Sequence, residues 1–165
     1  MPLIKAGKAI EDTWAKVGGE TPVEGDSDVI VDWTRLKEDR SLEGRNGRLG
    51  VLLANTVEAN DLAPYLPRLS LIVLDFPSFT DGRAFSQARV LRHQLGFNGE
   101  IRATGAPKAD QAPHLTRCGF DAIEVSDKQP LESWAHAEKV VAHVFQDGYS
   151  NGGLVSAAVA RKRQA

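Results

Sequence analysis

Cysteine is nearly absent from this chain of 165 residues, in which Cys118 is the one copy. A single thiol excludes an internal disulfide, and it excludes any iron–sulfur cluster or all-cysteine zinc site held by the chain alone, because each of these takes several thiolates. The sequence also lacks an apolar run of 18 residues and an apolar start like that of a signal peptide. We therefore expect no membrane partner and a cytoplasmic location.

The sequence also lacks a large excess of basic or of acidic residues. Twenty basic and 22 acidic residues give a net charge of −2, whereas nucleic-acid binding through bulk charge leaves a basic footprint. No nucleic-acid partner is expected. The length favours a single domain, and it is too short for a complete eight-fold β/α barrel of about 250 residues. We expect one α/β domain over 1–147, with N-terminal strands and a loop over 1–47 and β/α units over 48–147. A flexible linker and tail would follow over 148–165.

Apolar runs alternate with helical stripes from residue 48 onward. Strands are expected at 50–54, 69–75, 100–104 and 121–125, with helices at about 57–66, 80–95 and 110–118. Repeated strand–helix units imply a mainly parallel sheet with right-handed crossovers. A partial β/α barrel and a flavodoxin-like doubly wound sheet both fit this pattern.

The N-terminal third predicts further strands at 3–10 and 28–33, followed by a solvated loop at 37–48. These strands would add antiparallel pairing and cover a sheet edge that otherwise exposes unpaired amides and carbonyls. A second copy of the chain is the other candidate for that cover, so a homodimer is favoured over a monomer.

Ligands of parallel sheets bind beyond the carboxyl ends of the strands, so the segments that follow strands matter most. After the strand at 69–75, a carboxylate, two aromatics that are expected to be exposed and several hydroxyls precede a helix for which Thr80 or Asp81 is the expected N-cap. Arg83 in the first turn opposes the helix dipole, so either an anionic ligand or a neighbouring carboxylate is expected beside it. The binding candidates here are Phe76, Ser78, Phe79, Thr80, Arg83, Gln87 and Arg89, and Asp75 and Asp81 are the candidate acid/base groups.

A second candidate segment follows the strand at 100–104. A strand, a glycine-containing loop and a helix start have the general shape of phosphate-binding loops in β/α barrels. The loop would hold sulfate, sulfite or phosphate, or it would be a tight turn followed by a capping aspartate. Its candidates are Arg102, Gly105, Asp110 and Gln111. No dinucleotide fingerprint follows any strand, so no intrinsic cofactor is expected, although a flavin site can lack one. The four histidines are expected on the surface, with no metal site.

Three stretches resemble one bacterial family, the domain-of-unknown-function family 934. They run from Leu74 to Arg89, from Leu95 to Gly105, and through Asp110-Gln111 to Arg117-Cys118-Gly119-Phe120-Asp121, and the resemblance extends over about 28–146. Members of that family are typically encoded beside the assimilatory sulfite reductase gene and are often labelled as oxidoreductases of sulfite reduction. The resemblance therefore implies sulfur metabolism, namely sulfite reduction for cysteine synthesis, and brings no established catalytic residues.

Two functions are compatible with this pathway. Reducing sulfite takes sirohaem and an iron–sulfur cluster, which one cysteine cannot hold, so redox activity here would need a bound organic cofactor. We therefore expect an accessory protein that docks on sulfite reductase or its electron donor. Aromatic and arginine residues are enriched at interface hot spots, and they crowd the face from Phe76 to Arg89. The alternative is an enzyme or binding protein in which Arg83 and Arg102 hold an oxyanion in the strand-end crevice.

Overall fold

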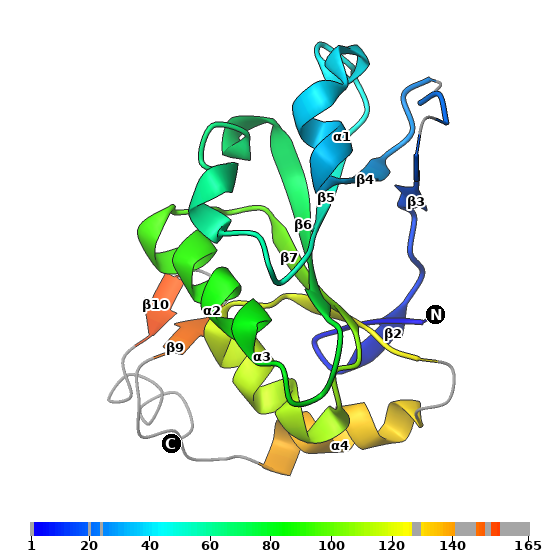
Figure 1. The fold of residues 1–165 in the computed structure, drawn as a ribbon. Helices are drawn as coiled ribbons and strands as arrows, with labels where there is room; N and C mark the ends of the chain where they lie inside the picture. The colour runs from blue at the N-terminus through cyan, green and yellow to red at the C-terminus, as the bar shows by residue number, and fades with distance from the viewer. Residues whose placement is uncertain are drawn as a thin grey trace.

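The computed structural model describes residues 2–19, 21–23, 25–126, 130–140, 148–150 and 153–155 (Figure 1). Its strands are β1 (Leu3–Lys5), β2 (Lys8–Ile10), β3 (Ala15–Lys16), β4 (Val29–Asp32), β5 (Leu49–Leu53), β6 (Leu69–Phe76), β7 (Glu100–Gly105), β8 (Ala122–Glu124), β9 (Gly148–Ser150) and β10 (Gly153–Val155). Its α-helices are α1 (Trp33–Glu38), α2 (Arg83–Arg89), α3 (Ala112–Cys118) and α4 (Leu131–Val140). Short 3₁₀ turns are η1 (Arg40–Leu42), η2 (Ala59–Leu62), η3 (Leu66–Arg68) and η5 (Ala109–Gln111), and η4 (Val90–Gln94) is a π-helical turn that continues α2.

Among the described residues, β1 to β8 form one sheet in the order β2-β1-β8-β7-β6-β5-β4-β3. The strands from β3 to β8 are parallel and adjacent in sequence order, and β1 and β2 join as an antiparallel hairpin beside β8. A doubly wound sheet reverses its strand order at a switch point, whereas a β/α barrel keeps the strands in sequence order. The order therefore decides between the two predicted architectures, and the fold is a curled half-barrel.

The curl brings distant strands together across the concave inner face. In a flat sheet β3 and β8 would lie about 24 Å apart, because neighbouring strands are about 4.8 Å apart. Yet the ammonium of Lys16 in β3 lies 2.6 Å from the carboxylate of Glu124 in β8. The segment before β3 also follows this face, since Asp12 pairs with Arg102 of β7 at 2.9 Å. Trp14 packs there with the apolar cluster of Ile30, Leu71 and Val73.

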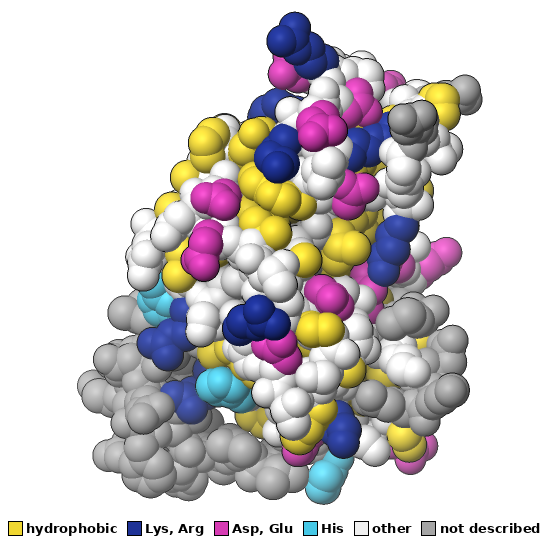
Figure 2. Space-filling view, in the orientation of Figure 1, with side chains coloured by type: hydrophobic (Ala, Val, Ile, Leu, Met, Phe, Trp, Pro, Cys, Tyr) yellow, Lys and Arg dark blue, Asp and Glu magenta, His cyan; other side chains and the backbone are white. Residues whose placement is uncertain are grey.

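The outer face carries the main hydrophobic core beneath the helices (Figure 1). Alternate strand residues such as Val51, Ile72 and Ile101 point to this face and are fully buried. The strand β6 has buried residues on both faces, which explains why its sequence is a continuous apolar run. On the surface seen in Figure 2, acidic and basic side chains are interspersed, in keeping with the balanced composition.

Several local predictions are wrong in detail. The predicted loop at 37–48 contains the end of α1 and the turn η1, and α1 begins where Asp32 accepts a hydrogen bond from the Arg35 amide at 2.8 Å. The predicted helix at 57–66 is instead the turn η2, with η3 following at Leu66–Arg68, because prolines interrupt regular helical bonding. The N-cap of α2 is Gly82 rather than Thr80 or Asp81.

The predicted linker contains the two short strands β9 and β10, which pair with each other. In the sequence, Asn151 and Gly152 stand between them, and this dipeptide is the strongest short signal for a hairpin. The other residues of the predicted tail lie outside the described residues.

The N-terminal third adds strands to the sheet, as predicted, but it does so at both ends, and antiparallel pairing is confined to β1 and β2. The hairpin β1–β2 lies beside β8, and β3 and β4 lie beside β5. The resulting edge strands β2 and β3 have three and two residues, and short edge strands are one way in which proteins avoid unwanted pairing.

Candidate functional site

Three polar residues lie side by side at the carboxyl ends of neighbouring strands on the inner face. Asp75 of β6 is paired in register with Thr104 of β7. The pairing of Arg102 with Ala122, two residues earlier, places Thr104 level with Glu124 of β8. Residues at the same register position point to the same face of a sheet. We call Asp75, Thr104 and Glu124 the carboxyl-end row.

Glu124 is the most buried member of the row, with 2% of its surface exposed. Its Oε2 atom accepts hydrogen bonds from the Thr104 hydroxyl at 2.7 Å and from the Lys16 ammonium at 2.6 Å. Its Oε1 atom is buried and has no partner among the described residues. Buried polar atoms in native proteins are nearly always hydrogen-bonded, and no described residue supplies the donor for this oxygen.

Asp75 is half-buried at the other end of the row. Burial raises the pKa of its carboxyl, because the charged form is less well solvated there. Gly105 lies directly beside it with φ of +90°, and a Cβ atom at Gly105 would lie 2.7 Å from the Asp75 Oδ1 and 2.3 Å from the Phe76 carbonyl oxygen. The close approach of the backbone therefore requires glycine at 105.

Below the row lies a chain of four charged side chains. Lys5 contacts Glu100 at 2.8 Å, Glu100 accepts from the Arg102 Nε at 2.5 Å, and Arg102 donates to Asp12 at 2.9 Å. Burial raises the pKa of Glu100, but the hydrogen bonds from Lys5 and Arg102 together outweigh it and lower the pKa. Arg102, a predicted oxyanion ligand, is thus buried and bound to two carboxylates.

The loop after β6 places the other predicted cation on the surface. The Arg83 guanidinium donates to Asp81 at 2.6 Å and 3.0 Å, which confirms the neighbouring-carboxylate alternative. Arg83 lowers the pKa of Asp81 to about 2. Phe79 is 41% exposed, and the Lys108 ammonium lies 4.4 Å from the centre of its ring.

The remaining predicted site residues divide into structural and exposed groups. Phe76 is buried against Phe85, so the prediction of two exposed aromatics is wrong for Phe76. Gln87 is buried and donates to the carbonyls of Ala54 and Val57, which attaches α2 to the chain after β5. The others are as follows: Ser78 contacts Thr80 at 3.3 Å between their hydroxyls, Gln111 accepts from the Lys108 amide at 3.1 Å, and Arg89 and Asp110 are exposed.

The inner face includes three residues that sequence reasoning missed, namely Lys16, Thr104 and Glu124. Glu124 has a signal, because it is an acidic residue at an alternate position of a short strand whose neighbours are apolar. Thr104 also has a signal, because it follows Glu100 and Arg102 at every second position of β7 and so shares their face. Lys16 has no signal, since its place follows from a curl that brings β3 opposite β8.

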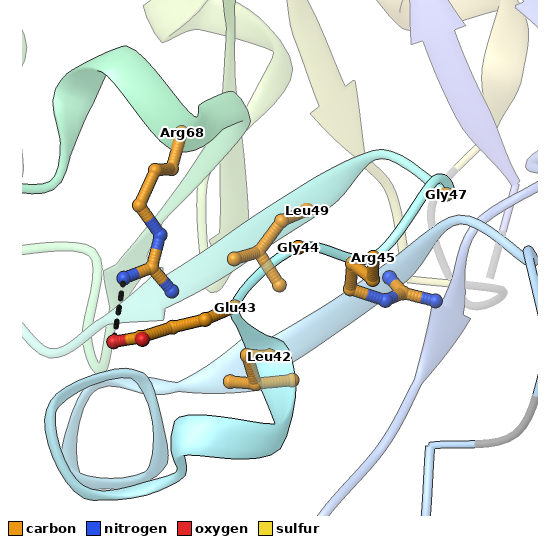
Figure 3. A pocket seen from close by; sticks show the side chains of 7 residues that line it. All are labelled: Leu42, Glu43, Gly44, Arg45, Gly47, Leu49 and Arg68. Carbon is orange, nitrogen blue, oxygen red and sulfur yellow. Dashed lines mark ion pairs between the residues drawn. The ribbon is translucent and has the colours of Figure 1, made fainter.

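Two surface pockets lie away from this row. One, of about 400 Å³, opens at the amino ends of β5 and β6, the end opposite to that at which parallel sheets bind ligands (Figure 3). In it Arg68 lies 3.7 Å from Glu43, and Arg45 donates to the Ser27 carbonyl at 2.7 Å. The other, of about 580 Å³, lies beside α1, where Arg35 pairs with Asp39 at 3.0 Å.

Neither a metal site nor a membrane span is found in the part of the chain that the structure describes. No group of three or more His, Cys, Asp or Glu side chains there could hold a metal ion. No helix there has the length and the apolar character needed to cross a membrane.

Comparison with known proteins identifies the family. The model of the family described as "Bacterial protein of unknown function (DUF934)" matches residues 50–153, which is more than half of the chain. The protein belongs to the DUF934 family. No curated protein and no solved structure matches it. The DUF934 match contains the whole carboxyl-end row. Lys16 and Asp12, which pair with Glu124 and Arg102 on the inner face of the sheet, precede the match.

Proposed function

We propose that the protein is an accessory protein of assimilatory sulfite reduction that docks on sulfite reductase or on its electron donor. The pathway comes from the genetic setting typical of family 934, to which the chain belongs. The observation that supports docking is the exposed ring of Phe79 after β6, with the Lys108 ammonium over it. Aromatic side chains, phenylalanine among them, are enriched at protein interfaces, and a cation over a ring is attracted to it.

The charges around Phe79 favour a protein partner over a small anion. Arg83 is largely neutralised by Asp81, so it offers little free positive charge to an oxyanion. Lys108 remains exposed and lies over the Phe79 ring. This surface presents an apolar ring with a basic side chain beside it, which would suit a partner surface with an acidic group.

The test measures binding of the full chain to purified sulfite reductase holoenzyme, and to its electron donor, by surface plasmon resonance. Phe79→Ala is expected to weaken binding at least about tenfold, the usual size for a hot-spot truncation. Ile10→Ala is the matched control, because Ile10 is 42% exposed but lies on β2 at the sheet edge. Equal binding by the two variants, or no binding to either protein, would refute the proposal.

The oxyanion alternative stays a prediction that needs a free cation in the crevice. Its two arginines have separate carboxylate partners, Asp81 for Arg83 and Asp12 with Glu100 for Arg102. Titration with sulfite and sulfate, followed by amide NMR shifts at Gly105 and Arg83, tests it. A yellow preparation would indicate the flavin version. The homodimer also stays a prediction, and light scattering on the full chain measures it.

A further inference from the structure

We propose that the carboxyl-end row of Asp75, Thr104 and Glu124, together with Lys16, binds a small molecule that carries a protonated amino group. This site is separate from the docking surface around Phe79, because it faces the concave side of the sheet. It therefore goes beyond the proposed function and does not depend on it.

The first argument is the unpartnered Oε1 atom of Glu124. The side chain is 3% exposed, and its other oxygen already binds Thr104 and Lys16. Leaving a buried acceptor without a donor costs free energy, and a carboxylate oxygen can be satisfied by an N–H or O–H group. No described residue supplies that group to Oε1, and an amino group bound at the row would supply it.

The second argument is the charge of the site. Asp75 and Glu124 contribute two carboxyl groups against the single ammonium group of Lys16, so the site has more acidic than basic groups. The layer below is balanced, since Lys5 and Arg102 face Glu100 and Asp12. No described residue donates a hydrogen bond to the Asp75 carboxylate, and burial alone shifts its pKa. A cation is the ligand that neutralises this excess.

The third argument is spacing and access. Asp75 and Glu124 are two strands apart, so their backbones lie about 10 Å apart with Thr104 between them. A short molecule with an ammonium group and a second donor would span two carboxylates at that separation. The Lys16 side chain is 50% exposed and Gly105 is exposed, so the neighbours of Glu124 reach solvent at the carboxyl end of the sheet. The Oε1 atom itself is buried, so binding there requires the Lys16 side chain to move.

Nuclear magnetic resonance of the isotope-labelled full chain tests the site. The probes are 1,4-diaminobutane and ethanolamine, with ethylene glycol as the neutral control, sulfate as the anionic control and magnesium chloride as the metal control. The amines are expected to shift the amide signals of Asp75, Thr104, Gly105 and Glu124 in a saturable way at millimolar concentration. Ethylene glycol, sulfate and magnesium are expected to leave those signals in place.

Glu124→Gln is expected to weaken the binding of both amines at least tenfold. The matched control is Glu100→Gln, because Glu100 lies on the same face two rows deeper and has Lys5 and Arg102 as partners for its two oxygens. Circular dichroism establishes that both variants are folded, and Asp75→Asn provides a second test if Glu124→Gln is not. The proposal is overturned if the amines cause no saturable shift, if ethylene glycol, sulfate or magnesium binds as well as they do, or if the variants that remain folded bind like the wild type.

Discussion

Replacing Arg92 by methionine is expected to lower the free energy of unfolding by about 3–5 kcal/mol, the usual cost of removing one partner from a buried ion pair. Arg92 lies on η4 and is 6% exposed. Its guanidinium donates to the carbonyls of Phe97 at 2.6 Å, Gly99 at 2.7 Å and Gly119 at 2.9 Å, and it also binds the Asp121 carboxylate. One side chain thereby joins the turns before β7 and β8.

The magnitude follows from what methionine leaves behind. Its apolar stem retains most of the packing, so the loss comes from the three carbonyls and from the Asp121 carboxylate, which is 20% exposed. Asp121 still accepts a hydrogen bond from the Ile101 amide at 2.8 Å, and this bond partly compensates the carboxylate for the lost guanidinium. Each hydrogen bond to a charged group contributes about 1.5–3 kcal/mol, and local relaxation reduces the sum to the range above. A domain of this class has about 5–15 kcal/mol in all, so the variant would be close to unfolding.

Urea unfolding followed by circular dichroism measures the effect, with an unchanged m value expected for a loss of stability alone. Arg83→Met is the matched control, since it removes an equally close but exposed ion pair with Asp81 and should leave the midpoint unchanged. Asp121→Asn in the Arg92→Met background should recover part of the loss, because it removes the uncompensated charge. A loss below about 1 kcal/mol, similar to that of a surface substitution, would refute the reasoning.

Four further outcomes are expected. Gly105→Ala should lower the free energy of unfolding by more than about 1 kcal/mol, because φ is +90° and the new Cβ would overlap the Phe76 carbonyl; an unchanged urea midpoint would contradict this. Burial raises the pKa of Asp75 above the ordinary value of 3.8. The protonated carboxyl therefore contributes to the free energy of unfolding below pH 3.8, and this contribution is lost as the pH rises through the raised pKa. Asp75→Asn should therefore be more stable than wild type at pH 7 and equal to it at pH 3, and equal midpoints at both pH values would show the reasoning to be wrong. Burial also raises the pKa of Cys118, so a disulfide reagent should label it at least about tenfold more slowly in buffer than in 6 M urea, and equal rates would indicate an accessible thiol. Deleting residues 1–27 removes β1, β2 and β3 and should cause aggregation, whereas a soluble, cooperatively unfolding fragment would show that these strands cover nothing.

The repeated β/α pattern was readable from sequence because it depends on local periodicity. The runs at 50–54 and 69–75 differ from the observed β5 and β6 by a residue at the ends. The choice between a half-barrel and a doubly wound sheet was not readable, since strand order depends on long-range pairing. The helix α1 was missed because its six residues are too few to show a periodic stripe, and its start depends on the capping side chain of Asp32.

The candidate site was predicted only in part, and for a physical reason. Sequence reasoning looked along single segments, so it identified Asp75 and Gly105, which lie directly at strand ends. It also assigned Arg83 and Arg102 to one crevice, because Arg83 follows the end of one strand and Arg102 lies near the end of the next. Side-chain direction separates them, since Arg102 points to the inner face and is bound by Asp12, whereas Arg83 turns to Asp81 on the surface.

The inner face also explains why the N-terminal third contributes more than edge strands. A complete barrel fills its interior with side chains from all its strands, whereas a half-barrel leaves a concave face that another segment must occupy. Here Asp12 and Lys16 supply that cover, and they compensate Arg102 and Glu124 from positions 90 and 108 residues earlier in the chain. Without them the buried Glu124 would have no cationic partner among the described residues and Arg102 would be left with Glu100 alone, which is costly in a partly desolvated interior. Lys16 reaches only one oxygen of Glu124, so the same cover that stabilises the half-barrel leaves the other, buried oxygen without a donor among the described residues.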